Sequence, residues 1–236
     1  MKKETISIII PTYQCGSILT ECLDSIFAQT RLPDEVIVVN DGSTDDTEER
    51  MKPYLDRIQY ISQENQGEQA ARTRGFNEST GLLVLFCDAD VILRPTMIEK
   101  MEHALEDHQE AAFAYSSFKF GWKLFKSFPF DADRLRKMNY IHTSALIRRE
   151  DFPGFDLKLK KFQDWDLWLS ILSKGRKGVF IDELLFEVRV NNRRGEISNW
   201  LPSFMYRWPW KYLSRKKKAI QKYEEGTKVI QEKYGL

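Results

Sequence analysis

The chain has 236 residues, enough to bury a substantial core as one large domain or as one domain with a smaller appendage. With 42% hydrophobic and 30% charged residues, its composition argues against a disordered or fibrous protein. The net charge of +1 conceals a local excess, because residues 193–236 hold eleven Lys or Arg and four Asp or Glu, a balance of +7. The upstream residues hold 25 basic and 31 acidic side chains, a balance of −6.

Three cysteines, an odd number without a C-x-x-C pair, argue against a disulfide framework and against a structural zinc site. The amino end has too few apolar residues before Pro11 for a signal peptide, and the longest apolar run, 82–87, is too short to cross a bilayer. We therefore expect a cytoplasmic protein that does not span a membrane.

In the first half of the chain, short apolar and β-branched runs alternate with stretches that have helical periodicity. Continuous apolar runs are typical of parallel strands that are buried on both faces. They predict a parallel sheet flanked by helices. The predicted strands are 6–10, 36–39, 58–61 and 82–87.

The second half predicts a helix over 95–108 and another over 164–174 that ends at Gly175. The predicted strands there are 111–117, 145–148, 179–181 and 184–190. Residues 118–140 show no clear period and receive no assignment.

Ligands of parallel α/β sheets bind beyond the carboxyl ends of the strands, so the residues after each run are candidate site residues. Asp88-Ala89-Asp90 places two carboxylates after a buried strand, where a hard divalent cation and a diphosphate could be held. The alternative is a solvated loop or an N-cap of the following helix.

The turn after the second strand, residues 40–47, is also acidic. Asp41 could accept a hydrogen bond from a nucleobase or a ribose hydroxyl, while Tyr13 stacks on the base. The alternative is a turn made by Gly42 with a helix cap after it. Farther on, Arg72 could neutralise a phosphate, whereas Arg74 is expected on a solvated helix face.

Five separated segments together resemble the family 2 glycosyltransferases of the GT-A fold, over residues 7–190. They are IIIPTYQ, VIVVNDGSTDDT, ENQGEQAARTRG, VLFCDAD and FQDWDLWL. The resemblance implies an α/β, GT-A-like, Rossmann-type three-layer fold with a mostly parallel central sheet. It also implies an inverting, metal-dependent, hexosyltransferase-like enzyme that uses a nucleoside-diphosphate sugar, with a UDP-sugar favoured and Mn²⁺ or Mg²⁺ as the metal.

The resemblance also implies residue roles. Asp88, Ala89 and Asp90 match the family's D-x-D, with Asp90 favoured as the direct metal ligand. Asp164 matches the catalytic base. The residues that match the nucleotide pocket are Pro11, Thr12, Tyr13, Asp41 and Arg72.

The sequence departs from the family pattern at three places. Asn40 replaces an acidic residue of the nucleotide turn, and Gln163 replaces the Glu that often precedes the base, so Asp166 stays open as an alternative carboxylate. A histidine expected after the last strand is missing, and Arg189, Arg193 or Arg194 could reach a diphosphate instead. His142 falls in the family's acceptor region, although a core or surface position is favoured for it.

We expect a glycosyltransferase domain over 1–192, with a nucleotide-sugar half (1–95) and an acceptor half (96–192), followed by a basic, aromatic-rich helical segment over 193–236. The aromatics and lysines of 200–218 suit peripheral contact with the inner face of a membrane. Packing of these aromatics on the catalytic domain is the alternative. No nucleic-acid-binding module is recognisable.

The predicted activity is transfer of a sugar to the hydroxyl of a saccharide or lipid-linked acceptor, in cell-surface polysaccharide or glycolipid assembly. A non-catalytic nucleotide-sugar-binding protein and a nucleotidyltransferase are the alternatives, since fold alone does not decide function. The D-x-D together with Asp164 favours transfer, because a binding protein needs no base.

Overall fold

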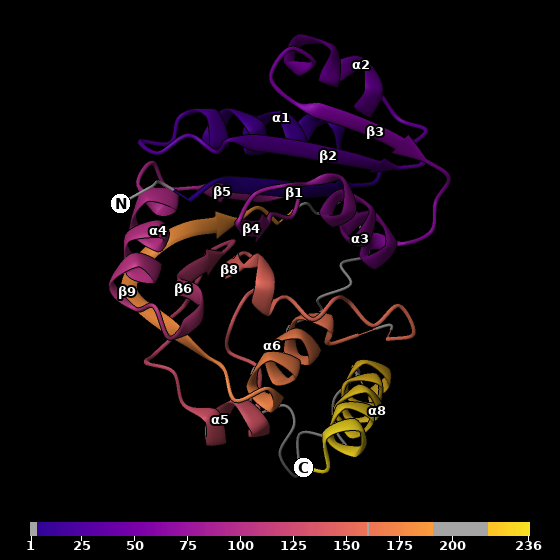
Figure 1. The fold of residues 1–236 in the computed structure, drawn as a ribbon. Coiled ribbons are helices and arrows are strands. Elements are labelled where there is room, and N and C mark those ends of the chain that lie inside the picture. Colours follow the sequence, from indigo (N-terminus) through magenta and orange to yellow (C-terminus); the bar gives the residue numbers. More distant parts are fainter. Residues whose placement is uncertain (1–3, 160, 191–216) are drawn as a thin grey trace.

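The structure is a computed structural model that describes residues 4–159, 161–190 and 217–236. Its described strands form one sheet in the order β3-β2-β1-β4-β8-β6-β9-β5, with β7 beside β6 (Figure 1). The strands are β1 (Ile6–Thr12), β2 (Glu35–Asp41), β3 (Gln59–Gln63), β4 (Leu83–Phe86), β5 (Val91–Leu93), β6 (Ala111–Phe120), β7 (Lys123–Phe125), β8 (Leu146–Arg148) and β9 (Lys177–Val188).

The described helices cover both faces of this sheet. They are α1 (Gly16–Phe27), α2 (Thr47–Met51), α3 (Glu68–Glu78), α4 (Met97–Asp107), α5 (Ala132–Lys137), α6 (Gln163–Ser173) and α8 (Lys217–Tyr234), with short 3-10 turns at Lys52–Tyr54 and Arg149–Asp151.

Six of the strands run in one direction. β1, β2, β3 and β4 pair in parallel. β8 is antiparallel to both β4 and β6, so β6 and its parallel neighbour β9 run with β4. β5, β7 and β8 run the opposite way. The predicted, mostly parallel α/β sheet is therefore confirmed, and the carboxyl ends of six strands meet at one edge.

The three layers follow from the two-residue period of the strands. Ile8 of β1 packs in one core cluster with Leu19 of α1 and Met97 of α4. Its neighbour Ile9 points to the opposite face and joins a second cluster with Trp168 of α6. The continuous apolar run of β1 is thus buried between helices on both sides.

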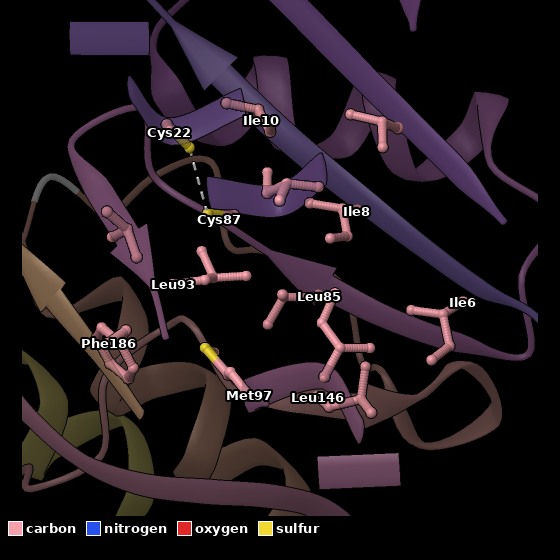
Figure 2. Close-up of a cluster of buried hydrophobic side chains, with 14 of the residues drawn as sticks. Ile6, Ile8, Ile10, Cys22, Leu85, Cys87, Leu93, Met97, Leu146 and Phe186 are labelled. Carbon is pink, nitrogen blue, oxygen red and sulfur yellow. Dashed lines mark hydrogen bonds between the residues drawn. The ribbon is translucent and has the colours of Figure 1, made fainter. Parts of the chain in front are cut away.

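The first cluster holds all three free cysteines, and Figure 2 shows Cys22 and Cys87. Cys22 of α1 and Cys87, which follows β4, lie with their Sγ atoms 3.7 Å apart, and the thiols share a weak hydrogen bond. The hydrogen bond with the Cys22 thiol, together with burial, raises the pKa of Cys87 well above its ordinary value. A buried, protonated thiol acts as an apolar packing group. Both cysteines are free thiols in the structure, and the sequence argues against a disulfide framework.

The second cluster is aromatic and fixes α6 against the sheet. Trp168 packs against Phe113 in a tilted arrangement with ring centroids 4.5 Å apart. Its indole N–H donates to the backbone carbonyl of Ile141 at 3.0 Å. The indole of Trp165 donates to the carbonyl of Leu135 at 2.6 Å. Both tryptophans are fully buried, so each indole N–H needs a hydrogen-bond acceptor within the protein, and the two backbone carbonyls supply it.

Some predicted boundaries were wrong. The two predicted strands 179–181 and 184–190 form a single strand, β9, whose apolar pattern is interrupted by Asp182 and Glu183 where its register against β6 shifts. The unassigned stretch 118–140 contains the end of β6, then β7 and α5. β5 was missed, because a strand of three residues leaves little periodicity to recognise.

Most of the predicted interfacial segment, residues 200–216, lies outside the described residues, as do Arg193 and Arg194. None of the helices in the described ranges combines the length and the apolar character that crossing a bilayer requires.

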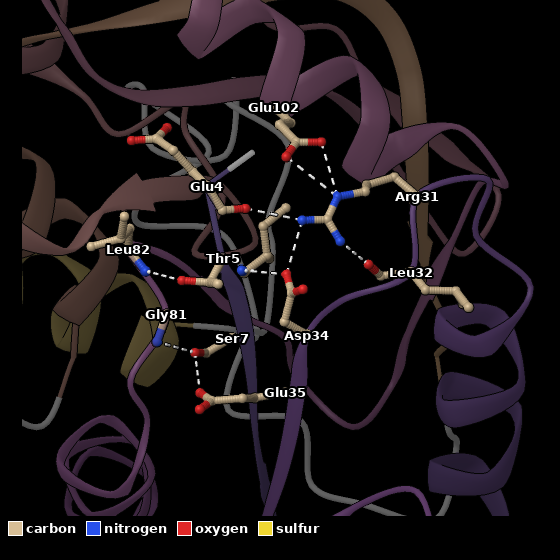
Figure 3. Close-up of polar contacts among 11 residues, drawn as sticks. Glu4, Thr5, Ser7, Arg31, Leu32, Asp34, Glu35, Gly81, Leu82 and Glu102 are labelled. Atoms are coloured by element: carbon tan, nitrogen blue, oxygen red, sulfur yellow. Dashed lines mark hydrogen bonds and ion pairs between the residues drawn. The ribbon is translucent and has the colours of Figure 1, made fainter. Parts of the chain in front are cut away.

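The amino ends of the strands, opposite the candidate site, are closed by a polar network around Arg31 (Figure 3). Its Nε donates to both carboxylate oxygens of Glu102, at 3.0 and 3.3 Å. Its Nη2 donates to Asp34 at 2.9 Å and to the backbone carbonyl of Glu4 at 3.0 Å. Arg31 is 9% and Glu102 3% exposed, so this pair links α4 to the start of the sheet in a water-poor setting.

Replacing Arg31 with Met should lower the free energy of unfolding by about 3 kcal/mol, because it leaves the carboxylate of Glu102 buried without a partner. Urea denaturation checks this. The matched control is Lys52→Met, which breaks an exposed pair with Glu49 and should leave the midpoint unchanged. Equal urea midpoints for the two variants would show that the buried pair stabilises the fold no more than the exposed pair does.

Candidate active site

Three loops at the carboxyl edge of the sheet are tied together by side-chain hydrogen bonds. Gln14, which follows β1 in a left-handed conformation (φ 55°), receives the backbone N–H of Asp45 at 3.0 Å and donates its amide to Thr44 at 2.8 Å. Its own backbone N–H donates to Ser43 at 2.9 Å. The loop after β1 is thus fixed to the loop after β2, a role for Gln14 that the sequence did not reveal.

Asp41, at the end of β2, ties in the third loop. Its Oδ1 accepts from the side-chain amide of Gln63 at 2.8 Å and from the backbone of Gln66 at 2.9 Å, and its Oδ2 accepts from the backbone of Gly67 at 2.8 Å. A carboxylate oxygen accepts two hydrogen bonds, so Oδ2 retains capacity for one more donor. Asp41 is buried and acts first as the organiser of the loop that leads into α3.

The amide of Asn40 also has a local structural role. Its Nδ2 donates to the hydroxyl of Tyr60 at 2.8 Å, and its Oδ1 accepts from the backbone of Ser43 at 3.0 Å. An amide both donates and accepts, so it joins β3 to the turn after β2 without adding a charge. The departure of Asn40 from the family pattern is therefore accommodated by its neighbours.

Arg72 is the buried cation of this region, with 4% of its surface exposed. Its Nη2 forms ion pairs with Asp88 and, at 2.7 Å, with Glu68, while its Nε is buried without a hydrogen-bond partner. It can sit so deep because α3 lies close on β1: a Cβ at Gly75, one turn later, would clash with Ile9. A positive charge is thus held at the edge where β4 ends.

The D-x-D segment forms a tight turn between β4 and β5, closed by a hydrogen bond from the backbone of Val91 to that of Asp88 at 3.0 Å. Burial opposes the charged form of Asp88, but the guanidinium of Arg72 outweighs it and holds the pKa of that carboxyl below its ordinary value. The backbone carbonyl of Asp90 accepts from Arg189 at 2.8 Å, which brings the end of β9 to the same turn.

Asp164 lies in the first turn of α6 and belongs to the same electrostatic cluster. Its Oδ2 accepts from the amide of Asn139 at 2.6 Å, and its Oδ1 from the backbone of Trp165 at 2.8 Å. Burial raises the pKa of Asp164 to about 6, although the Trp165 N–H and the charge of Arg72 favour the carboxylate. A carboxylate with a pKa near neutrality is suited to accept a proton.

His142 joins this cluster from the second half of the chain, which the sequence analysis did not favour. It precedes β8, which runs antiparallel beside β4, so the start of β8 meets the end of β4. Its ring packs against both Phe118 and Phe186, with centroids 4.9 and 5.1 Å away. Burial lowers the pKa of His142, although the nearby carboxylate of Asp88 favours the protonated ring.

The tautomer of His142 follows from its hydrogen bond. The backbone N–H of Ser144 donates to Nδ1 at 3.1 Å, so Nδ1 carries a lone pair and the neutral ring has its proton on Nε2. His142 is therefore a neutral hydrogen-bond donor. His103 and His108 instead border a shallow hollow between α4 and β9, away from the cluster.

Across the described ranges, no three His, Cys, Asp or Glu side chains are grouped to hold a metal ion by themselves. The carboxylates of Asp88 and Asp90 nevertheless fit Mg²⁺ or Mn²⁺, which proteins often hold through one or two carboxylates together with the phosphates of a substrate. Arg72 pairs with Asp88, and Asp90 stays the candidate for direct contact that the family resemblance favours.

Comparison with known proteins agrees with this geometry. The uncharacterized glycosyltransferase YibD of Escherichia coli is 38% identical over 142 residues, which cover 58% of this chain and 41% of that protein. The putative teichuronic acid biosynthesis glycosyltransferase TuaG of Bacillus subtilis is 26% identical over 249 residues, which cover 93% of this chain and 98% of that protein.

Two solved structures share the fold. S. aureus TarS has a TM-score of 0.66 at 20% identity, over 79% of this chain and 37% of that one. The mannosyltransferase PcManGT of Pyrobaculum calidifontis, solved with GDP-Man and Mn²⁺, has a TM-score of 0.65 at 20% identity, over 82% of this chain and 59% of that one. The chain thus spans well under half the length of YibD and of TarS.

The family model for glycosyl transferase family 2 matches residues 7–157, more than half of the chain. This range includes β1, the turn after β2, Arg72 and the D-x-D turn. The chain therefore belongs to glycosyl transferase family 2.

Proposed function

We propose that this chain is an inverting, metal-dependent glycosyltransferase that moves a sugar from a nucleoside diphosphate to an acceptor hydroxyl. The observation that carries the proposal is the placement of Asp164, whose pKa is raised to about 6, in one electrostatic cluster with Arg72 and Asp88. A base and a buried cation beside a D-x-D turn are the groups that such a transfer requires.

The nucleotide is proposed to bind over the ends of β1 and β2. Tyr13 is 45% exposed and can offer a ring face to the base, while Oδ2 of Asp41 retains room for one donor. Pro11 and Thr12 are buried at the end of β1 and are proposed to lie beneath the nucleotide. The structural relatives were solved with GDP-Man or with UDP-GlcNAc, which supports a nucleotide-sugar donor, and we favour UDP.

The diphosphate is proposed to lie between Arg72 and the D-x-D turn. Asp90, with Asp88, would hold a divalent metal, which supplies Lewis-acid stabilisation of the departing diphosphate. Arg72 adds a fixed positive charge in a desolvated position. The Nε2–H of His142 can donate to a donor oxygen without changing the net charge of the site.

Inversion places the base on the face of the sugar opposite the leaving diphosphate. Asp164 is proposed to take the proton of the acceptor hydroxyl as the hydroxyl oxygen attacks the anomeric carbon, and the bond to the diphosphate breaks in the same step. Asn139 and the Trp165 N–H hold the carboxylate in one orientation. With a pKa of about 6, the carboxyl of Asp164 is ionised at neutral pH and can accept the proton.

The acceptor is proposed to be a saccharide or lipid-linked saccharide of cell-surface polysaccharide assembly. Similarity to TuaG supports this class of acceptor. Peripheral membrane contact through residues 200–218 stays a prediction, as do the expected cytoplasmic location and the division of the chain at residues 95 and 192.

Nucleoside diphosphates should stabilise the native chain in a metal-dependent way. A thermal-shift panel of UDP, GDP, CDP and dTDP, each with Mn²⁺, Mg²⁺ or EDTA, should single out one base, because a ligand at 100 times its Kd adds about 2.7 kcal/mol. Asp90→Asn should lose the metal dependence. If none of the nucleotides shifts the melting temperature, the proposed donor site is wrong. Release of pyrophosphate from a nucleoside triphosphate would indicate a nucleotidyltransferase.

Asp164→Asn should lower kcat by roughly 1,000-fold with little change in donor Kd, because the isosteric amide cannot accept the proton. Release of the nucleoside diphosphate from the nucleotide sugar measures transfer, and titration calorimetry measures donor binding. Asp133→Asn, on the exposed face of α5, is the matched control and should behave as wild type. Wild-type turnover in the Asp164 variant would reject this residue as the base.

The rate should also depend on pH. Asp164 acts only as the carboxylate, so kcat should fall about tenfold per pH unit below its pKa of about 6 and level off above it. A pH–rate profile at saturating donor, with thermal shifts confirming a folded protein at each pH, measures this limb. The residual rate of Asp164→Asn should show no such decrease at low pH. A wild-type rate that stays constant down to pH 4.5 would contradict the assignment of Asp164 as the base.

A further inference from the structure

Helix α8 packs against the start of α6, the helix that carries Asp164 (Figure 1, yellow beside orange). Ile230 of α8 is fully buried in the aromatic core cluster that also contains Trp165 and Trp168. Apolar packing therefore docks α8 on the domain. The polar contacts between the two helices are concentrated at the first turn of α6, which is the turn that positions the proposed base.

Two side chains near the end of α8 hold Asp166. The Nζ of Lys233 lies 2.7 Å from Asp166 and 2.9 Å from Asp156. The hydroxyl of Tyr234 donates to Oδ1 of Asp166 at 2.8 Å and to its backbone carbonyl at 3.0 Å. Asp166 is only 5% exposed and lies two residues after Asp164, so these contacts fix the backbone of the same helical turn.

A second contact holds the residue that begins the helix. Phe162 adopts a left-handed conformation (φ 60°), and its carbonyl accepts the backbone N–H of Asp166 at 2.8 Å. Its ring packs edge-on against Tyr223 of α8 at 5.2 Å. A Cβ at Gly226 would lie 2.7 Å from this ring, so α8 approaches Phe162 as closely as a glycine permits. A left-handed non-glycine residue is strained and needs such support.

Asp164 lies between these two points of contact. On its other side, Asn139 holds the carboxylate at 2.6 Å. Asp156, the second partner of Lys233, follows Phe155, whose ring lies 5.5 Å from the guanidinium carbon of Arg72. Through Lys233, α8 therefore contacts two of the segments that approach the charged cluster from the second half of the chain.

We propose that α8 is a positioning element of the active site, in which Lys233 and Tyr234 act through Asp166 to orient Asp164 toward the acceptor. This inference rests on the proposed function. The side chain of Lys233 is 36% exposed, so water screens its pair with Asp166 and the pair contributes to geometry more than to net stability. The apolar contacts of Ile230 and Tyr223 supply the docking energy.

Lys233→Met and Tyr234→Phe test the inference in the full chain. Each should lower kcat by roughly 10- to 100-fold while donor Kd stays within about twofold, since a small misplacement of a catalytic group costs rate rather than donor affinity. Lys233→Arg should restore most of the rate. Lys228→Met is the matched control, because Lys228 lies on the same helix and, among the residues that the structure describes, pairs only with exposed Glu232 at 3.6 Å.

A second readout does not depend on turnover. The backbone N–H of Trp165 donates to Asp164, so its hydrogen exchange reports how well the carboxylate is held. We expect roughly tenfold faster exchange at Trp165 in Lys233→Met than in Lys228→Met. The assay of turnover uses UDP-glucose, UDP-N-acetylglucosamine and GDP-mannose with Mn²⁺, and follows release of the nucleoside diphosphate.

The outcomes separate the inference from the proposed function. Unchanged kcat and unchanged exchange in Lys233→Met overturn the positioning role, even where wild type is an active transferase. If Lys233→Met and Tyr234→Phe lose thermal stability, donor binding and rate in parallel, the positioning role is also overturned, because α8 would then act only on folding. Faster exchange at Trp165 in Lys233→Met, in a protein whose wild type releases no nucleoside diphosphate, supports the positioning role of α8 and counts against the proposed transferase activity.

Discussion

The buried charge of Arg72 is the constraint on which the site depends. A guanidinium that is 4% exposed cannot lose its proton, so the fold must supply anions, and it supplies Asp88 and Glu68. The pairing holds Asp88 ionised against the cost of burial. It also leaves Nε of Arg72 without a partner in the described structure, a donor that a diphosphate could use. Because Asp88, Glu68 and Asp164 surround this one guanidinium, the cluster carries net negative charge, which a divalent cation at the D-x-D turn would offset.

Strand direction explains why residues far apart in the sequence meet around that charge. The parallel strands deliver Asp41 and Asp88 to the carboxyl edge, whereas β8 and β5 run the other way and begin there. The segment before β8 therefore brings His142 to the end of β4, and the pairing of β5 with β9 brings Arg189 to the D-x-D turn. A mixed sheet lets both halves of the chain contribute to one site.

This topology also explains what the sequence could and could not predict. The polar residues after β1, β2 and β4 were found because a buried parallel strand leaves a continuous apolar run, and its end can be read locally. The strands β5 and β8 are three residues long, so their pairing, and with it the place of His142, has no local signal. Gln14 and Lys233 were missed for the same reason, since their partners lie in other elements.

The first turn of α6 shows how two similar carboxylates acquire different roles. Asp164 and Asp166 are two residues apart, and the sequence left both open as the base. Asp166 is held by the ammonium of Lys233 and the hydroxyl of Tyr234, so its charge is already used inside the fold. Within the described parts of the chain, Asp164 receives hydrogen bonds from two neutral donors, the amide of Asn139 and a backbone N–H, while burial raises its pKa to about 6. The surroundings therefore give Asp166 a structural role and favour Asp164 for the proposed proton transfer.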